Sequence, residues 1–318
     1  MKKAFLGKGR WIFLVVMAAS LSLTAISFQR DIPAEQAKQK YATASSKFVH
    51  IDGMDVHYQD VGVGPTLILV HGSNCSLQSW DGWQKHLRRE FRVISVDLPG
   101  HGLTGPNPSG RYDYLTMVRF LDRLADLLHV DKFSIAGNSM GGAIAVNYTI
   151  LHPEKVEKLI LIDSLGYPEA IPPLTLRMWG YPLIGHLLTV FTPRFVYAQS
   201  IRDIYGHKER VSDELIDRYF ELLLRDGNRN ATRVRFTDPV WNIDQSRLKA
   251  IDAPTLIMWG EKDPWFSAKF GTRFAHDIPG ATLRLYPDLG HVPMEEEPQT
   301  TARDASLFLM QGRKSNAP

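Results

Sequence analysis

The chain has 318 residues, of which 44% are hydrophobic and 22% charged, a composition typical of a globular protein. Its formal net charge of +3 arises at the N-terminus, because residues 1–50 hold eight Lys/Arg and two Asp/Glu, which leaves 29 basic and 32 acidic residues in the rest. The body therefore offers no basic face for nucleic acid. The single cysteine, Cys75, excludes an internal disulfide, and no side chains have the spacing of metal ligands.

The first 30 residues contain a segment typical of membrane insertion. Four basic residues among the first ten precede an uncharged stretch from Trp11 to Phe28. Eighteen helical residues would span about 27 Å, close to the thickness of a bilayer core. The stretch is only slightly longer than the apolar part of a secretory signal, and Ala-Ile-Ser at 25–27 resembles a cleavage site. We expect residues 1–28 to be a membrane anchor, or alternatively a cleaved signal peptide, with the body exported to the periplasmic or extracellular side.

Residues 29–48 are polar and predict a tether, helical around residues 34–42. Beyond the tether, short runs that are nearly continuous in apolar character alternate with helical patterns. Such runs are typical of parallel strands covered on both faces. The runs are TLILVHG (66–72), FRVISVDLPG (91–100), KFSIAGNS (132–139), KLILIDS (158–164), PTLIMWGEKD (254–263) and TLRLYPD (282–288).

Two further patterns complete the core. Residues 54–62 alternate in polarity like an edge strand, and the glycine-rich residues 61–65 predict a hairpin turn after it. Residues 114–130 keep apolar side chains at helical spacing. The alternation predicts an α/β fold with a mostly parallel sheet and helices on both faces.

A segment of another character, about 80 residues long, spans residues 166–245 and exceeds a simple crossover. We interpret it as a helical cap inserted into a core formed by residues 49–165 and 246–318. Residues 212–228 predict an amphipathic helix that opens at Ser212. We expect large apolar side chains of the cap to line a substrate pocket. They are Trp179, Leu183, Leu187, Phe191 and Phe195.

Polar residues follow three of the predicted strands at one edge of the sheet, where ligands bind in open parallel sheets. They are Ser139, Asp263 and His291. A serine hydroxyl becomes a good nucleophile when an imidazole takes its proton and a carboxylate orients that imidazole. Ser139 lies in a G-x-S-x-G motif (137–141) at a strand-to-helix turn, and the chain order Ser, Asp, His is expected for a nucleophile elbow of this kind. We therefore predict Ser139 as nucleophile, His291 as general base and Asp263 as the orienting acid.

One acid and several histidines compete for these roles. Asp163 also ends a predicted strand and is the alternative acid, whereas Asp288 beside a proline is interpreted as a turn residue. Only His291 follows the last strand. We interpret three other histidines as structural, namely His71, His101 and His152.

With these motifs the chain resembles the α/β-hydrolase superfamily over residues 49–312, and within it capped bacterial serine esterases and lipases and also meta-cleavage product (C–C) hydrolases. The resemblance implies an oxyanion hole at the backbone N–H groups of Ser73 and Met140. Met140 follows the nucleophile at a helix N-terminus, where the dipole favours a developing oxyanion. The motifs are LVHGSN (69–74), VDLPGHGLTG (96–105), GNSMGG (137–142), WGEKD (259–263) and GHVPMEEEP (290–298).

The activity that the resemblance implies is hydrolysis of an apolar small-molecule ester through an acyl-enzyme, with no metal or organic cofactor. Ser139 excludes dehalogenases and epoxide hydrolases of this fold, which need Asp at the elbow. C–C hydrolases usually carry Trp after the catalytic histidine, where this chain has Val292. A C–C hydrolase and a ligand-binding or signalling member of the fold remain the alternatives. The sequence assigns neither further substrate-binding residues nor an oligomeric state.

Overall fold

A computed structural model describes residues 27–237 and 243–312 of the chain. The centre of the molecule is an eight-stranded sheet with the order β1-β2-β4-β3-β5-β6-β7-β8. The strands are β1 (Ser46–Ile51), β2 (Met54–Val61), β3 (Thr66–Val70), β4 (Arg92–Val96), β5 (Phe133–Asn138), β6 (Val156–Ile162), β7 (Thr255–Gly260) and β8 (Thr282–Tyr286). β2 pairs antiparallel with β1 and β4, and all other neighbours are parallel. The predicted α/β class with a mostly parallel sheet is confirmed.

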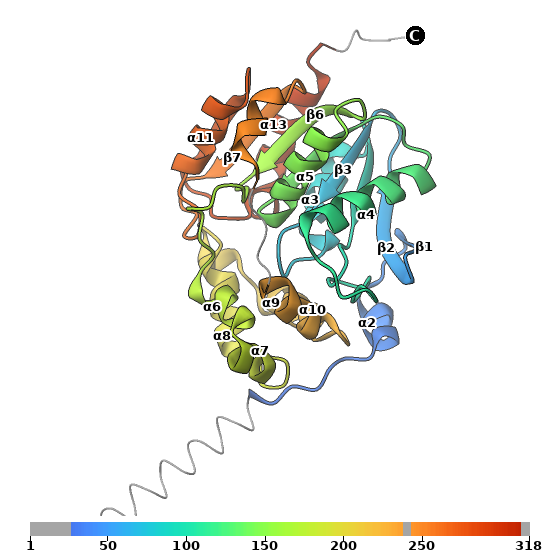
Figure 1. The fold of residues 1–318 in the computed structure, drawn as a ribbon, viewed down its shortest axis with the longest axis vertical. Helices are drawn as coiled ribbons and strands as arrows, with labels where there is room; N and C mark the ends of the chain where they lie inside the picture. The colour runs from blue at the N-terminus through green and yellow to red at the C-terminus, as the bar shows by residue number, and fades with distance from the viewer. Residues whose placement is uncertain (1–26, 238–242, 313–318) are drawn as a thin grey trace, which may run out of the picture.

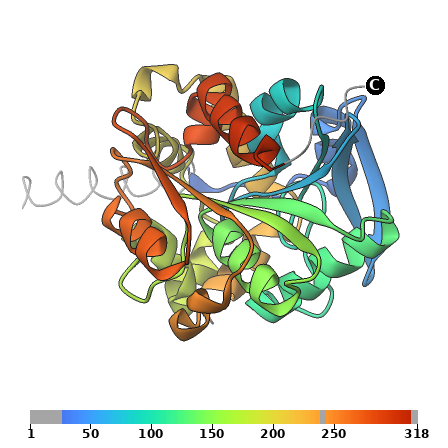
Figure 2. The same ribbon diagram turned by 90° about the horizontal axis from the view of Figure 1, so that it is seen from above.

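Helices cover both faces of this sheet (Figure 2). α4 (Tyr114–Leu127), α5 (Met140–Leu151) and α11 (Lys269–Asp277) pack on one face, and α3 (Asp81–Leu87) and α13 (Pro298–Met310) on the other. Every residue of β5 and β7 is buried, because both faces of these central strands are covered. Three short helices complete the core: η1 (Leu77–Trp80), η4 (Gln245–Ala250) and α12 (Pro293–Glu296).

The antiparallel side of the sheet differs from the prediction. β2 is not at the edge, because β1 pairs along its outer side. Residues 61–65 do not form a hairpin turn either, because β4 lies between β2 and β3 in the sheet. The alternation of β2 in polarity does not mark an exposed face, because its polar side chains His57 and Gln59 are buried.

The chain between β6 and β7 forms a layer of helices over one end of the sheet (Figure 1). The helices are α6 (Leu174–Arg177), η2 (Met178–Gly180), α7 (Pro182–Leu188), α8 (Arg194–Asp203), η3 (Lys208–Arg210), α9 (Asp213–Leu224) and α10 (Asn228–Thr237). α9 begins after Ser212, whose hydroxyl accepts a hydrogen bond from the Leu215 N–H, as the sequence predicts. We call residues 166–245 the cap.

Of the predicted tether (29–48), residues 29–41 run along the cap with the expected helix over 34–41, and residues 46–48 already belong to β1 of the sheet. α2 (Ala34–Tyr41) contacts α9, where Lys40 Nζ lies 2.6 Å from Glu221 Oε2. The buried Arg229 side chain of α10 binds Asp31 at 2.7 Å. Residues 1–26, most of the predicted anchor or signal peptide, lie outside the described residues. Among the described residues, no helix has the length and apolar character needed to cross a bilayer.

Candidate active site

Ser139 occupies a strained turn between β5 and α5. Its backbone angles, φ 54° and ψ −118°, fall in a region that side-chain-bearing residues rarely adopt. The two flanking glycines make this turn possible. A Cβ atom at Gly137 would lie 2.2 Å from the Gly141 carbonyl oxygen, and one at Gly141 would lie 2.2 Å from the Val70 carbonyl oxygen. The G-x-S-x-G spacing therefore lets the backbone fold tightly enough to present one hydroxyl at the tip.

His291 and Asp263 meet at the same end of the sheet. His291 Nδ1 lies 2.7 Å from Asp263 Oδ2, and both side chains are buried. The other oxygen, Oδ1, accepts hydrogen bonds from the backbone N–H groups of Trp265 (2.7 Å) and Phe266 (3.0 Å). Asp263 is thus fixed by its own loop after β7, and in turn orients the imidazole.

The free nitrogen of His291 lies in a cavity that Ser139 shares. Nε2 is buried and has no hydrogen-bond partner among the described residues. His291, Ser139 and Ser73 line one small cavity of about 30 Å³. With Nδ1 taken by Asp263, Nε2 is the nitrogen available to a nucleophile, as a general base requires.

Two residues that the sequence analysis did not single out hold the His291 loop. The Asn138 side-chain amide, directly before the nucleophile, donates to the His291 carbonyl oxygen (3.0 Å). Glu296 accepts from the N–H groups of Gly290 (2.9 Å) and, from the cap, Gly206 (3.0 Å). The histidine loop is therefore tied to both the elbow and the cap. No local pattern in the sequence distinguishes these polar residues from solvated ones.

Asp163, the alternative acid, lies behind the triad rather than in it. One carboxylate oxygen accepts from the Gly260 N–H (3.0 Å), and the other has no partner among the described residues. Asp163, Asp263 and His291 each place one polar atom within 4.8 Å of the others. Burial raises the pKa of Asp163 well above its usual range, and the nearby Asp263 carboxylate raises it further. Of these two acids, Asp163 is therefore the one whose neutral form its surroundings favour.

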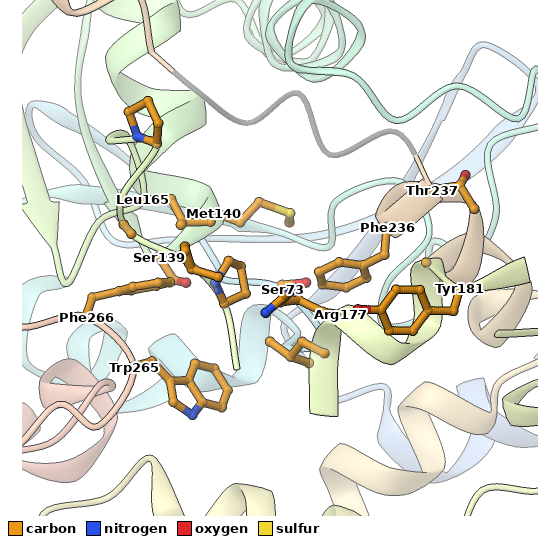
Figure 3. A pocket seen from close by; sticks show the side chains of 16 residues that line it. Ser73, Ser139, Met140, Leu165, Arg177, Tyr181, Phe236, Thr237, Trp265 and Phe266 are labelled. Carbon is orange, nitrogen blue, oxygen red and sulfur yellow. The ribbon is translucent and has the colours of Figure 1, made fainter. Parts of the chain in front are cut away.

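The predicted oxyanion donors lie beside the nucleophile. Met140 is the first residue of α5, and Ser73 lies in the loop after β3. Both residues line the main cavity together with Ser139 (Figure 3). The N-terminal end of α5 adds its dipole at this point. The site thus places candidate donors where an acyl oxyanion would form.

A buried cation from the cap supports the Ser73 loop. Arg235 of α10 donates through Nη2 to Asn74 Oδ1 (2.8 Å) and to Ser73 Oγ (3.2 Å). Asn74 has a left-handed backbone with φ 56°, a conformation that asparagine adopts more readily than most residues. Burial lowers the pKa of Arg235 to about 10, which keeps it charged at neutral pH. The sequence analysis missed Arg235, because an arginine in an amphipathic helix is usually a solvated residue.

His71 and His101 serve the structure of this loop, as interpreted from the sequence. His71 Nε2 accepts from the Leu98 N–H (3.0 Å), which leaves Nδ1 to donate to the Gly72 carbonyl oxygen (2.7 Å). Burial lowers the pKa of both histidines, so they remain neutral. His152 lies at the end of α5 beside Tyr148, away from the cavity.

A cavity of about 420 Å³ opens over Ser139, between the core and the cap. Its walls are mainly apolar, and no acidic residue of the described chain lines it. Figure 3 shows Phe266 and Trp265 on one side of Ser139 and Phe236 and Tyr181 on the other. The remaining lining residues are Leu165, Pro168, Ala170, Ile171, Pro172, Leu176, Arg177, Gly180 and Thr237.

The predicted pocket lining is wrong. None of the five large cap residues expected there lines the cavity. Trp179 is buried inside the cap, and Phe191 packs against Phe28. Leu183, Leu187 and Phe195 are instead exposed. The helices α6 and α7 are short, and each begins at or directly after a proline. Helical spacing in the sequence therefore could not show which of their side chains face the cavity.

Comparison with known proteins places these features in a family. The profile described as "Alpha/beta hydrolase family" matches residues 67–305. A 2-hydroxy-6-oxo-2,4-heptadienoate hydrolase from Pseudomonas putida is 28% identical over 274 residues, which cover 83% of this chain and 95% of that protein.

Solved structures share the fold. A meta-cleavage product hydrolase from Pseudomonas fluorescens IP01 matches with a TM-score of 0.74 at 23% identity, over 84% of this chain and 98% of that one. A membrane phospholipase A, described as a bacterial virulence factor, matches with a TM-score of 0.70 at 24% identity, over 97% of this chain and 98% of that one. At such identities the likeness concerns the fold alone.

Proposed function

Because the chain belongs to the alpha/beta hydrolase family and is a hydrolase, we propose that it cleaves carboxylic esters through an acyl-enzyme formed on Ser139. One observation carries this proposal. The 2.7 Å bond from Asp263 to His291 leaves Nε2 free in a cavity that Ser139 shares. These are the three groups that acyl transfer to serine needs.

The proposed reaction has two steps. Ser139 Oγ attacks the ester carbonyl carbon while His291 Nε2 takes its proton, and the N–H groups of Ser73 and Met140 bind the oxyanion. The C–O bond then breaks as His291 returns the proton to the leaving alcohol oxygen. Water, activated by the same imidazole, attacks the acyl-enzyme and releases the acid. Asp263 holds the imidazole and stabilises its charged form without taking the proton.

We propose an apolar acyl or alcohol group as the substrate's larger part. The cavity of about 420 Å³ is lined mainly by apolar side chains such as Leu165, Phe236 and Phe266. Burying an apolar chain against them is favourable, whereas among the described lining residues the exposed Arg177 is the only Lys, Arg, Asp or Glu that a charged group would meet.

Meta-cleavage C–C hydrolysis is the second candidate, because curated relatives such as the Pseudomonas putida enzyme carry that activity in their names. The residue after His291 speaks against it. It is the buried Val292, where the C–C hydrolases that the chain resembles usually have Trp. Both reactions would use the same nucleophile, so only the substrate separates them.

We further propose that the body is exported and held at the membrane by residues 1–28, or released by cleavage there. The support is the uncharged stretch 11–28 behind a basic start. N-terminal sequencing of membrane and soluble fractions decides between the two. An intact Met1 in the membrane fraction indicates an anchor, and a start near Phe28 in the exported soluble fraction indicates a cleaved signal.

The activity test uses the full chain in detergent with p-nitrophenyl esters from acetate to palmitate, and separately a coloured meta-cleavage product. We expect ester turnover that is lost in Ser139→Ala and retained in Ser134→Ala, because Ser134 is a buried serine within the preceding strand β5. Loss of the meta-cleavage colour without ester turnover would establish the second candidate instead. A folded protein without either activity would point to a ligand-binding member of the fold.

A further inference from the structure

Large apolar side chains are exposed on the outer helices of the cap. Leu183 and Leu187 of α7 are 82% and 58% exposed, and Phe195 of α8 is 58% exposed. Figure 1 shows α7 at the end of the cap farthest from the sheet. Large apolar side chains that are exposed on neighbouring helices indicate an interaction site, because a soluble protein usually buries them. We define the cap patch as Phe28, Ile171, Leu174, Leu183, Leu187 and Phe195, all of which are exposed.

The charged side chains within residues 170–202 of the cap are all basic. Residues 170–202 contain no Asp or Glu but three arginines, although acidic residues outnumber basic ones beyond residue 50. Arg194 and Arg202 are paired with acids of α9, whereas the exposed Arg177 has no carboxylate partner among the described residues. A stretch of the cap in which apolar side chains alternate with arginine, one of them without a carboxylate partner among the described residues, suits an interface with anionic lipid headgroups.

The chain also joins the body at the cap patch. The Thr192 N–H donates to the Ser27 carbonyl oxygen (2.8 Å), and the Phe28 ring packs edge-on against Phe191. The 18-residue uncharged stretch therefore ends on the cap patch itself. Any membrane that this stretch enters would meet the body at α7 and its neighbours.

The cap patch shares residues with the mouth of the active-site cavity. Ile171 lines the cavity and is also exposed in the cap patch. Tyr181, which precedes α7, likewise lines the cavity with an exposed ring. Ile171 thus belongs both to the cap patch and to the wall of the cavity that contains Ser139.

We propose that the cap patch docks on the surface of a lipid bilayer and that acyl substrates enter the cavity from the bilayer. The second half of this proposal rests on the proposed ester hydrolysis, whereas docking does not. The apolar side chains would lie among the acyl chains, and Arg177 at the level of the headgroups.

Docking is measured without catalysis. The background is the full chain with Ser139→Ala, which removes the nucleophile, and Cys75→Ser, which removes the native cysteine. One fluorophore is attached at Leu187→Cys. In the matched control it is attached at Leu307→Cys, a similarly exposed leucine of α13 on the core. Vesicles contain phosphatidylcholine with or without phosphatidylglycerol, and bromine on their acyl chains quenches by contact. We expect quenching at position 187, stronger with phosphatidylglycerol, and none at 307. Equal quenching at both sites, or no quenching at position 187, overturns docking. A change in fluorescence at position 187 that depends on protein concentration and needs no lipid also overturns it, and would assign the cap patch to contact with a second copy of the chain.

Substrate entry is measured by activity. The full chain with Leu183→Glu, Leu187→Glu and Phe195→Glu is compared with Leu307→Glu. We expect turnover of soluble p-nitrophenyl butyrate to change by less than about twofold in both variants. Turnover of a long-chain ester in vesicles should fall about tenfold or more in the triple variant and stay at the parental value in Leu307→Glu. Unchanged vesicle turnover overturns entry from the bilayer. If the parent chain hydrolyses neither ester, the proposed function fails, and the quenching result still decides docking.

Discussion

Asp263 and His291 are joined by a 2.7 Å hydrogen bond between Oδ2 and Nδ1, although they belong to loops after different strands, β7 and β8. A second buried acid, Asp163, lies within 4.8 Å of both and ends the neighbouring strand β6. The two acids differ in partners. Asp263 carries the imidazole and two backbone N–H groups, whereas Asp163 carries one N–H group.

This difference predicts the outcome of removing each charge. Asp263→Asn should lower kcat by about 10⁴-fold, because the amide favours the wrong imidazole tautomer. Asp163→Asn should lower it by less than about tenfold, because Asp163 does not bond His291 and its raised pKa favours the neutral form that Asn mimics. Steady-state kinetics of both variants on one soluble ester measures this contrast. The opposite order would assign the acid role to Asp163.

Asp163 also predicts a pH dependence of stability. Its native pKa is raised by burial and by Asp263, whereas an unfolded aspartate titrates near 3.9. Above about pH 4 the unfolded chain releases a proton that the native protein keeps, so the free energy of unfolding falls as pH rises, by up to about 1.4 kcal/mol per pH unit until the native pKa is reached.

The measurement is urea unfolding between about pH 5 and 8. Asp163→Asn removes the titrating group, so its stability should fall less steeply with pH than that of the parent. Asp252→Asn, at an exposed position with the same change of charge, should keep the parental slope. Parallel slopes for the parent and Asp163→Asn would show that Asp163 is ionised in the native protein.

Arg235 should act as a positioning residue for the Ser73 loop. Arg235→Met removes its hydrogen bonds to Asn74 and Ser73, and we expect kcat to fall about 10- to 100-fold with KM changed by less than about threefold, because an oxyanion donor acts in the transition state. Arg235→Lys should recover part of kcat, because it restores the charge.

Arg233→Met on the same helix is the matched control for Arg235. The Arg233 guanidinium is hydrogen-bonded to the Asn230 side chain at the surface, so kcat should stay at the parental value. A lower melting temperature of Arg235→Met with unchanged kcat would show that Arg235 only stabilises the fold.

Gly141 should tolerate no side chain. In Gly141→Ala the new Cβ would lie 2.2 Å from the Val70 carbonyl oxygen, so either β3 or the elbow must move. We expect a loss of several kcal/mol in the free energy of unfolding, about the size of a severe packing defect. Gly110→Ala, at a positive φ with no atom near the new Cβ, should cost only about 1 kcal/mol. Similar losses for both variants would contradict the steric argument.

Local patterns were sufficient to predict the parallel sheet, the strand-to-helix turn at Ser139 and the loops that carry Asp263 and His291. Each of these follows from a pattern of a few consecutive residues, such as a continuous apolar run or two glycines around a serine. The antiparallel pairing of β2 could not be predicted, because its partner β4 is set by a crossover of the chain and not by its own alternation.

Three features depended on the tertiary structure. The sequence predicted Asp263 as the acid but left Asp163 as an alternative, because both follow a strand: β6 ends at Ile162 and β7 at Gly260. Only the hydrogen bond to His291 separates them. The contact of Arg235 with Asn74 joins residues that lie 161 positions apart.

The cap shows the same limit in its apolar residues. Leu183 and Leu187 have the residue type of a pocket lining, yet they are exposed, while Leu176 and Phe236 line the cavity. The hydrophobic character of a side chain means that its transfer out of water lowers the free energy. The path of the chain through the cap decides whether such a side chain lies in the cavity, in the core or at a membrane. The sequence does not reveal this, because helices as short as α6 and α7 contain too few residues for a periodic pattern to identify the buried face.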